Sequence, residues 1–285
     1  MRHRWLNDAI APAALVCFGA GAALAACPSD EAIDAFVADW KAGTPTKAIA
    51  VDATMEDALC AQHKVVARLG EDLGAPVGYK AGLTSQAAQQ RFGVDQPVRG
   101  VLLEGMLLEN GATVPATFGA RPLFEADMLV VIADAAVNEA TSPEEVLPHV
   151  REVIPFIELP DLVLAEGEPM SGPILTAINV GARQGVLGPR IAVEQSDAFL
   201  QSLADMDVKV MDGGGEELAA AKGAAVLGHP LNSVVWLVEN GVTLKPGDYV
   251  SVGSIGPLMP TAAGRTVTAT YSGLPGHPEV TVSFE

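Results

Sequence analysis

The chain has 285 residues, of which 49% are hydrophobic and 18% are charged, so it can bury a substantial core as one domain or a compact pair. Basic residues number 17 and acidic residues 35, which gives a formal net charge of −18. This balance excludes the electrostatic footprint of a nucleic-acid-binding protein and disfavours binding to anionic lipid surfaces. We interpret the charge as a contribution to solubility, with an acidic-partner role as the alternative.

The first 26 residues have the pattern of an export signal. Basic residues in MRHRW precede the apolar run AIAPAALVCFGAGAALAA, and small residues lead into Cys27. This order predicts a secretory signal peptide over 1–26, with an uncleaved membrane anchor as the alternative. The predicted location is therefore periplasmic or secreted.

Cys27 has two possible fates. Ala23-Leu24-Ala25 is a cleavage site of the A-x-A type, and cleavage there leaves Cys27 and Cys60 to form a disulfide. The segment 24–27 also resembles a bacterial lipobox, which would anchor the chain to a membrane through a lipid on Cys27. We favour the disulfide, because Ser29 can begin a helix almost immediately and leaves no flexible tether.

Two amphipathic helices are predicted next. Segment 29–41 has apolar residues at i, i+3, i+4 and i+7 behind a serine cap with acidic residues in the first turn, and segment 54–70 repeats the pattern up to Gly70. The predicted apolar positions are Ile33, Phe36, Val37 and Trp40 in the first helix and Met55, Leu59, Val66 and Leu69 in the second. Together the helices form a predicted N-terminal helical cap over 27–75.

From residue 76 to 285 the sequence predicts a single mixed-sheet domain. Short β-rich runs alternate with Gly and Pro turns, and helical insertions are expected at 84–92, 143–150 and 230–240. The predicted strands lie in PVGYKAG, GVLLEGMLL, FEADMLVVI, EVIPFIEL, VKVM, YVSVGS, TVTATY and EVTVSF. The predicted class is therefore α+β, with a small helical part packed on one larger sheet domain.

Glu125 and Asp127 are two carboxylates placed two residues apart in an apolar strand. Residues i and i+2 of a strand project from the same face, so these side chains should point together. A solvated sheet face is the ordinary explanation for such a pair. Glu158 favours a different one, because it lies in a second apolar run, VIPFIELPD, where a buried carboxylate must be paired, hydrogen-bonded or metal-bound.

Three carboxylates without a neighbouring His or Cys make an all-oxygen ligand set. Such a set suits Mg²⁺ or Mn²⁺ rather than zinc. The five histidines show no metal-ligand spacing, so we assign none of them a role.

Several segments taken together resemble the 2-keto-4-pentenoate hydratase branch of the fumarylacetoacetate hydrolase superfamily. No single segment is decisive, but their order and spacing over residues 76 to 284 are specific. The segments are GYKAGLTS, FGVDQPVRGVL, RPLFEAD, VIPFIELPD, AINVGARQGVLG, GHPLNSVVWL and LKPGDYVSVGS. The resemblance implies a mixed β-sheet roll or barrel-like core of the fumarylacetoacetate hydrolase C-terminal type and an enzyme of aromatic-compound catabolism. A homo-oligomer is also expected from it.

The resemblance further implies a metal-dependent hydro-lyase acting on a 2-hydroxy-2,4-dienoate or the corresponding 2-oxo-enoate. Glu125, Asp127 and Glu158 would bind one divalent ion, and Lys80 would face it to pair with substrate charge or to move a proton. The expected partner is thus a small anionic 2-oxo acid, whose enolate the ion stabilises.

Three further residues are weaker candidates. Arg121 stands beside the ligand strand and would bind substrate, with a structural salt bridge as an equal alternative. Asp95 and Ser254 would take part in catalysis, although a turn before Pro97 and a loop hydroxyl are equally good explanations for them.

The sequence departs from the family pattern at three positions. Asp127 stands where the pattern usually has Glu, Ile178 stands where an acidic residue commonly precedes Asn179, and His229 stands where Asn is common. The departures at Asp127 and Ile178 leave open an exported, non-catalytic 2-oxo acid binding protein. A decarboxylase or a C–C hydrolase of the same superfamily is a further alternative, since the decarboxylase uses the same enolate.

Overall fold

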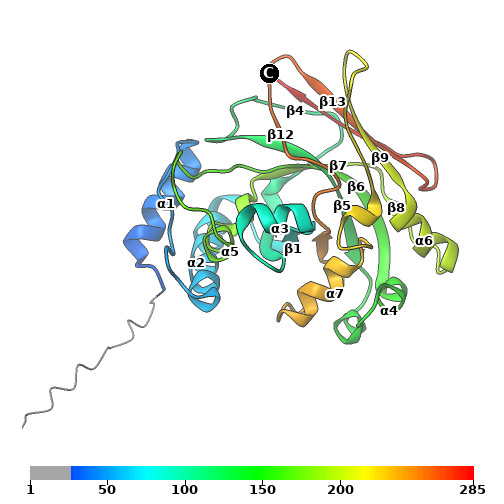
Figure 1. The fold of residues 1–285 in the computed structure, drawn as a ribbon, viewed down its shortest axis with the longest axis horizontal. Helices are drawn as coiled ribbons and strands as arrows, with labels where there is room; N and C mark the ends of the chain where they lie inside the picture. Colours follow the sequence, from blue (N-terminus) through cyan, green and yellow to red (C-terminus); the bar gives the residue numbers. More distant parts are fainter. Residues whose placement is uncertain (1–26) are drawn as a thin grey trace, which may run out of the picture.

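The computed structural model describes residues 27–285, which fold into a helical cap and two β-sheets (Figure 1). The larger sheet has nine strands in the order β2-β1-β11-β5-β6-β7-β3, with β12 paired to β5 and β8 to β6. The smaller sheet has five strands in the order β10-β9-β13-β14-β4. The larger sheet curls into a half-barrel, and the predicted α+β class is confirmed.

The strands alternate with short helices along the chain. The strands are β1 (Pro76–Gly82), β2 (Val98–Leu103), β3 (Leu107–Leu108), β4 (Ala112–Val114), β5 (Leu123–Ile132), β6 (Val150–Leu159), β7 (Gln184–Leu187), β8 (Ile191–Ala192), β9 (Asp207–Asp212), β10 (Glu217–Lys222), β11 (Tyr249–Ser251), β12 (Met259–Pro260), β13 (Thr266–Ser272) and β14 (Glu279–Phe284). The α-helices are α1 (Asp30–Ala42), α2 (Met55–Leu73), α3 (Gln86–Phe92), α4 (Pro143–Val146), α5 (Gly172–Ala177), α6 (Asp197–Asp205) and α7 (Asn232–Glu239). Short 3₁₀ segments connect several of them, including one over Asn179–Gly181.

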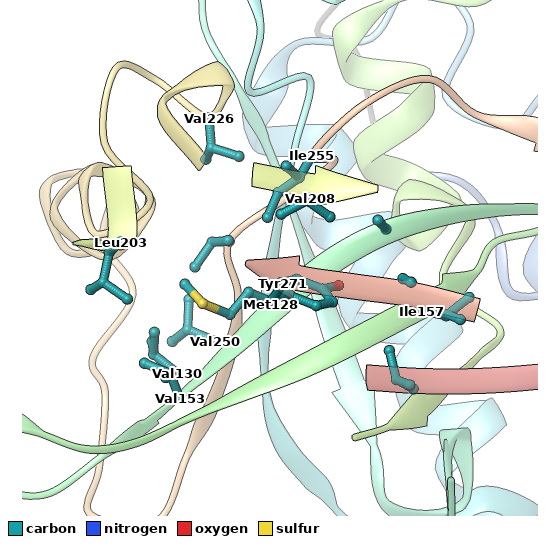
Figure 2. Close-up of a cluster of buried hydrophobic side chains, with 14 of the residues drawn as sticks. Met128, Val130, Val153, Ile157, Leu203, Val208, Val226, Val250, Ile255 and Tyr271 are labelled. Carbon is teal, nitrogen blue, oxygen red and sulfur yellow. The ribbon is translucent and has the colours of Figure 1, made fainter. Parts of the chain in front are cut away.

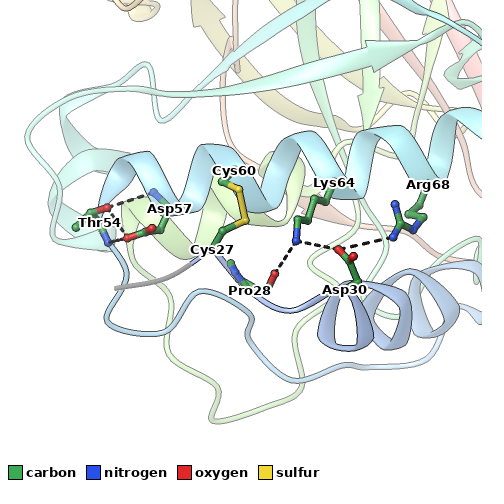
Figure 3. Close-up of a disulfide and its surroundings, with 8 residues drawn as sticks. All are labelled: Cys27, Pro28, Asp30, Thr54, Asp57, Cys60, Lys64 and Arg68. Atoms are coloured by element: carbon green, nitrogen blue, oxygen red, sulfur yellow. Dashed lines mark hydrogen bonds and ion pairs between the residues drawn. A yellow bond between two sulfur atoms is a disulfide. The ribbon is translucent and has the colours of Figure 1, made fainter. Parts of the chain in front are cut away.

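Helices α1 and α2 lie side by side in the N-terminal segment for which a cap was predicted, and a disulfide joins the start of this segment to α2. Ser29 caps α1 through its side chain, and Thr54 caps α2 in a capping box with Asp57. Cys27, just before α1, is bonded to Cys60 in α2, which confirms the predicted pairing (Figure 3). Beside this bond, Lys64 of α2 pairs with Asp30 of α1.

The second helix differs from its prediction in its C-terminal end and in the residues that it buries. It continues past Gly70 to Leu73 and ends at Gly74. Met55 is exposed, and the buried face instead contains small residues that let α2 lie close to its neighbours. The buried positions are Ala58, Ala61, Gln62, Val65, Val66 and Leu69.

The cap packs on the sheet domain through one shared apolar cluster. Phe36 and Trp40 of α1 belong to the same cluster as Val101 of β2 and Leu175 of α5. Polar contacts also join the two parts. The Arg183 guanidinium lies over the Trp40 ring and donates to the Trp40 carbonyl and to the buried Asp161 carboxylate. The cap is therefore continuous with the core of the sheet domain.

Strands β5 and β6 run through the middle of the larger sheet and supply most of the central core. All of β5 after its first residue is buried, as expected for a near-continuous apolar run covered on both faces. Met128 and Val130 of β5 pack with Val153 and Ile157 of β6 and with Tyr271 of β13 (Figure 2). This packing fixes the register of the two strands that carry the three carboxylates.

Most predicted elements are present, but some boundaries and helices differ. The insertion predicted over 143–150 is α4 followed directly by a 3₁₀ segment over Leu147–His149, and β6 begins at Val150. Two helices were not predicted: α5 is only six residues long, and α6 follows a serine cap with nine residues. Strand β10 was also missed, because its alanine-rich sequence ELAAAK has the composition of a helix.

No helix within 27–285 combines the length and the apolar character needed to cross a membrane. The leader predicted over 1–26 lies outside the described residues.

Candidate active site

The three carboxylates meet on one face of the larger sheet. Glu125 of β5 lies directly opposite Glu158 of β6 in the antiparallel ladder, and Asp127 follows two residues later on the same face. All three side chains are buried, with Asp127 at 0% exposure. The alternative of a solvated sheet face is therefore wrong.

Burial makes it costly to ionise this cluster. Removal from water and the nearby Glu158 raise the pKa of Glu125 well above its ordinary range, against the opposing influence of Lys80 and of a hydrogen bond with Ser254. The same causes raise the pKa of Asp127 to about 7, although hydrogen bonds from Ser251 and the Met128 amide oppose the shift. Without an additional cation, the site thus disfavours three full negative charges.

Lys80 of β1 is the protein cation that faces the carboxylates. Its side chain is 4% exposed and forms an ion pair with Glu158. Its Nζ also donates to the Val180 carbonyl at 3.2 Å. Lys80 thus lies where it could pair with a bound oxyanion in place of Glu158.

Asp127 is held by donors that the sequence did not reveal. Its carboxylate accepts hydrogen bonds from Ser251 Oγ, from the Met128 amide at 2.5 Å and from the Gly253 amide at 3.0 Å. The Tyr271 hydroxyl approaches the Asp127 carbonyl at 2.5 Å and so ties the strand to β13. Ser251 could have been suspected as a hydroxyl in an apolar strand, but nothing marked Tyr271.

Carboxylate oxygens without a hydrogen-bond partner show whether a metal ion fits this cluster. Glu125 Oε2 and Glu158 Oε2 are buried and have no hydrogen-bond partner among residues 27–285. Hard carboxylate oxygens of this kind suit a divalent cation with oxygen preference. As the side chains lie, no three His, Cys, Asp or Glu side chains of residues 27–285 converge on one point, because Glu158 is paired with Lys80 and Asp127 with its three donors. The donor set therefore fits such an ion once Lys80 releases Glu158 and Asp127 gives up one of its hydrogen-bond donors.

A strained turn at Asn179 and Val180 positions the Val180 carbonyl, which accepts a hydrogen bond from Lys80. Asn179 and Val180 have φ of 57° and 53°, which costs about 1–2 kcal/mol for each residue with a Cβ. The Asn179 side chain stabilises the turn by accepting from the Val101 amide at 2.7 Å and donating to the Val101 carbonyl at 2.9 Å. Gly82 leaves room for the turn, since a Cβ there would lie 2.5 Å from Val180 Cγ1.

Of the three weaker candidates, the structure brings only Ser254 to the carboxylates. Ser254 lies close enough to Glu125 to lower the pKa of that carboxyl, and its hydroxyl donates to the Gly256 carbonyl at 2.6 Å. Asp95 is exposed between α3 and β2. Arg121 is exposed as well, and its guanidinium donates to the Leu164 carbonyl at 3.3 Å. Neither of these two side chains faces the buried site.

Two positions that depart from the family pattern have structural roles. Ile178 is 2% exposed and belongs to the apolar cluster beneath the cap. His229 precedes α7, where its Nδ1 accepts from the Leu231 amide and its Nε2 lies 3.1 Å from the Leu200 carbonyl. A neutral imidazole satisfies both contacts.

Thr84 has a buried hydroxyl beside the site, and the sequence analysis did not predict a role for it. It is 2% exposed, and its Oγ1 has no partner. Gly253 approaches it so closely that a Cβ there would lie 2.5 Å from this oxygen. Thr84 therefore lies against the same loop that donates to Asp127.

The half-barrel sheet, with buried carboxylates beside a lysine, belongs to a chain whose relatives and structural neighbours are members of the fumarylacetoacetate hydrolase superfamily. The chain is 30% identical to 4-oxalocrotonate decarboxylase of Pseudomonas putida over 231 residues, which cover 78% of this chain and 83% of the relative. It is 32% identical to 2-keto-4-pentenoate hydratase 1 of Dechloromonas aromatica over 202 residues, or 70% of this chain and 74% of the relative. The chain belongs to the family of 2-keto-4-pentenoate hydratases and 4-oxalocrotonate decarboxylases. A scan of family models found no match.

Solved structures agree with this assignment. The 4-oxalocrotonate decarboxylase from Pseudomonas putida G7, complexed with magnesium and adipate, superposes with a TM-score of 0.78 and 26% identity, covering 90% of this chain and 97% of that one. A fumarylpyruvate hydrolase from Pseudomonas aeruginosa, in complex with Mn²⁺ and pyruvate, has a TM-score of 0.55 at 16% identity over 73% of this chain and 89% of that one, which shows a shared fold.

The comparisons correct the predicted location. The relatives are 4-oxalocrotonate decarboxylases and 2-keto-4-pentenoate hydratases, and none of the comparisons supports a periplasmic or secreted protein, so that prediction is wrong. The lipid-anchored alternative also fails, because Cys27 Sγ is bonded to Cys60 in this structure.

Proposed function

We propose that Glu125, Asp127 and Glu158 bind one Mg²⁺ or Mn²⁺ ion and that the protein is a hydro-lyase. The substrate would be a 2-hydroxy-2,4-dienoate or its 2-oxo-enoate tautomer. The observation that carries this proposal is the pair of unpartnered oxygens on Glu125 and Glu158, buried on one sheet face beside Lys80. Relatives that are hydratases, and solved neighbours that contain magnesium or calcium, support it.

The ion supplies electrostatic stabilisation of the enolate when it is bound. Lys80 would leave Glu158 and pair with a substrate oxyanion, because its Nζ is already held at the correct side by the Val180 carbonyl. Ser254, beside Glu125, would hold a substrate oxygen or a water. The buried surroundings keep bulk water away, which strengthens each of these interactions.

The overall reaction is balanced by one water molecule. Protonation of the terminal carbon of the dienol gives the conjugated 2-oxo-enoate, and water then adds with its hydroxyl on C4 and its hydrogen on C3. Lys80 is the group best placed to hold or move a proton, since it is the cation that faces the cluster. Asp95 and Arg121 would take part only after movement of their exposed segments.

The second candidate is a 2-oxo acid decarboxylase. The match to 4-oxalocrotonate decarboxylase covers 78% of the chain, against 70% for the hydratases, and loss of CO₂ passes through the same kind of enolate. Glu158 argues modestly against a C–C hydrolase, for which Asp is the expected third ligand. A non-catalytic binding protein is the third candidate, motivated by Asp127 and Ile178.

We expect metal-dependent loss of dienol absorbance from 2-hydroxypenta-2,4-dienoate, with the 4-hydroxy-2-oxo acid as the identified product. Product identification is needed because the dienol also ketonises without an enzyme. Glu125→Gln should abolish the activity, and Glu109→Gln, at an exposed position, should retain it. Release of CO₂ from a 2-oxo-enedioate without hydrated product would favour the decarboxylase, and saturable binding without turnover would favour the binding protein.

We also propose that residues 27–75 act as a cap over the catalytic part, 76–285, and that the protein is a homo-oligomer. The shared apolar cluster supports the first statement. Light scattering at several protein concentrations would test the second.

A further inference from the structure

Tyr271 connects the smaller sheet to the two strands that contain the carboxylates. It lies on β13 and is buried among core side chains that include Met128 and Ile157 (Figure 2). Its hydroxyl oxygen lies 2.5 Å from the Asp127 carbonyl, 3.0 Å from the Phe156 carbonyl and 3.4 Å from the Phe156 amide. One side chain of the smaller sheet therefore contacts the backbones of both β5 and β6 at the same place.

These contacts are made at one rung of the β5–β6 ladder. Asp127 lies directly opposite Phe156, and the neighbouring rung on the same face pairs Glu125 with Glu158. In an antiparallel ladder, facing backbone groups normally bond to each other. Here a tyrosine hydroxyl contacts those groups, because it can donate to a carbonyl and accept from an amide. The backbone position of Asp127 relative to Glu158 therefore depends on a side chain from another sheet.

The backbone position of Asp127 matters because its carboxylate is short and already oriented. The Met128 amide and the Gly253 amide both donate to Oδ1, and the Ser251 hydroxyl donates to Oδ2. Magnesium requires oxygen ligands at about 2.0–2.1 Å in nearly ideal octahedral geometry. A small shift of the β5 backbone is therefore a shift of the carboxylate, which has little freedom to compensate for it.

We propose that Tyr271 is a positioning residue that sets the place of Asp127 among the ligands of the divalent ion. The inference rests on the metal site of the proposed function. It gives the smaller sheet a part in that site, because β13 supplies the hydroxyl that joins the two ligand strands. Removal of the hydroxyl should weaken magnesium binding while the fold remains.

The test is calorimetric titration of the full chain with magnesium chloride. Tyr271→Phe removes only the hydroxyl oxygen and keeps the buried ring. Outer-shell hydrogen bonds to metal ligands typically change metal affinity about 10- to 100-fold, so we expect the magnesium Kd of Tyr271→Phe to rise at least about tenfold. Thermal melts of the same samples confirm that the variant is folded.

Two control variants remove a hydroxyl elsewhere and should bind magnesium like the wild type. Tyr249→Phe makes the same chemical change at a hydroxyl that accepts from Arg190. Thr268→Val removes a hydroxyl from β13 itself, where it bonds to the Thr281 hydroxyl at 2.8 Å, away from β5 and β6. Thr268→Val therefore shows whether general loosening of β13 is enough to weaken binding.

The outcomes separate this inference from the proposed function. Wild-type magnesium affinity in Tyr271→Phe would overturn the inference and leave the proposed function intact. An equal loss of affinity in Thr268→Val would also overturn it. If the wild type binds magnesium without hydrating the dienoate, the proposed function fails, whereas weaker binding by Tyr271→Phe still supports the inference. An absence of magnesium binding to the wild type overturns both.

Fluorine NMR of the otherwise wild-type chain decides if Tyr271→Phe does not fold. The sequence has three tyrosines, so labelling with 3-fluorotyrosine gives one signal each for Tyr79, Tyr249 and Tyr271. Tyr79→Phe and Tyr249→Phe assign these signals by elimination. The Tyr271 signal should shift when magnesium is added, and an unchanged Tyr271 signal at saturating magnesium would overturn the inference.

Discussion

Glu125 and Glu158 face each other directly across the β5–β6 ladder, and each has one buried carboxylate oxygen without a partner. Lys80 neutralises only one of the two, because its ion pair is with Glu158. This relationship leads to a prediction about stability in the presence and absence of metal.

Glu125→Gln should remove the stabilisation that metal gives. Burial and Glu158 raise the pKa of Glu125, so a neutral amide should leave the metal-free protein at least as stable as the wild type. Magnesium at 100 times its Kd should raise the unfolding free energy of the wild type by about 2.7 kcal/mol and that of the variant by none. Thermal melts with EDTA and with magnesium measure both effects, with Glu109→Gln as the control. An equal rise in Glu125→Gln would show that this carboxylate is not a ligand.

Asn179→Asp should lower turnover more than it lowers metal binding. The aspartate cannot donate to the Val101 carbonyl, so the turn that positions the Val180 carbonyl for Lys80 loses a hydrogen bond. The unfolding free energy should fall by about 1–3 kcal/mol, and kcat should fall while the magnesium-induced rise in Tm remains.

Asn138→Asp is the matched control for this variant. Asn138 makes the same pair of bonds with the Leu244 backbone, outside the site. The unfolding free energy of Asn138→Asp should therefore fall by a similar amount, and its kcat should be unchanged. Equal kcat values for the two variants would mean that the Asn179 turn contributes only to stability.

His229 should make the fold sensitive to mild acid. Burial lowers the pKa of His229 below its ordinary value near 6.5, against the influence of the Leu200 carbonyl. The folded state thus binds fewer protons than the unfolded chain at this site. Its contribution is complete above pH 6.5 and is lost as the pH falls from there through the folded pKa.

Urea unfolding at pH 7.5 and pH 5.5 measures this contribution. His229→Asn should lose less stability than the wild type between the two values, because asparagine does not titrate. If the two proteins show the same pH dependence, the imidazole is not the source.

Reduction of the Cys27–Cys60 bond should destabilise the cap. The bond closes a loop with a sequence separation of 33, for which chain entropy gives a stabilisation of about 3–4 kcal/mol. Urea unfolding with and without reductant checks this value, and Cys27→Ser/Cys60→Ser should match the reduced protein. Intact mass two hydrogens below that of the reduced chain would verify the bond, whereas an unchanged urea midpoint after reduction would contradict the predicted stabilisation.

Local patterns in the sequence were sufficient for the first helix and the central strands. Ser29 and the spacing of Phe36 and Trp40 predict α1 correctly, since capping and 3.6-residue periodicity depend only on near neighbours. The two-residue spacing of Glu125 and Asp127 likewise predicted that they share one face of the strand, as the structure shows.

Which groups surround those carboxylates was decided only by the tertiary structure. Ser251 and Tyr271 reach Asp127 from positions 124 and 144 residues away, and no local pattern encodes such a contact. Tertiary structure also left Arg121 exposed despite its place beside the ligand strand. The sequence thus determines strands, caps and the residue types available for chemistry, because these follow from local periodicity. The fold decides which of them become buried and coupled, because strand pairing brings distant segments together and removes water from between them.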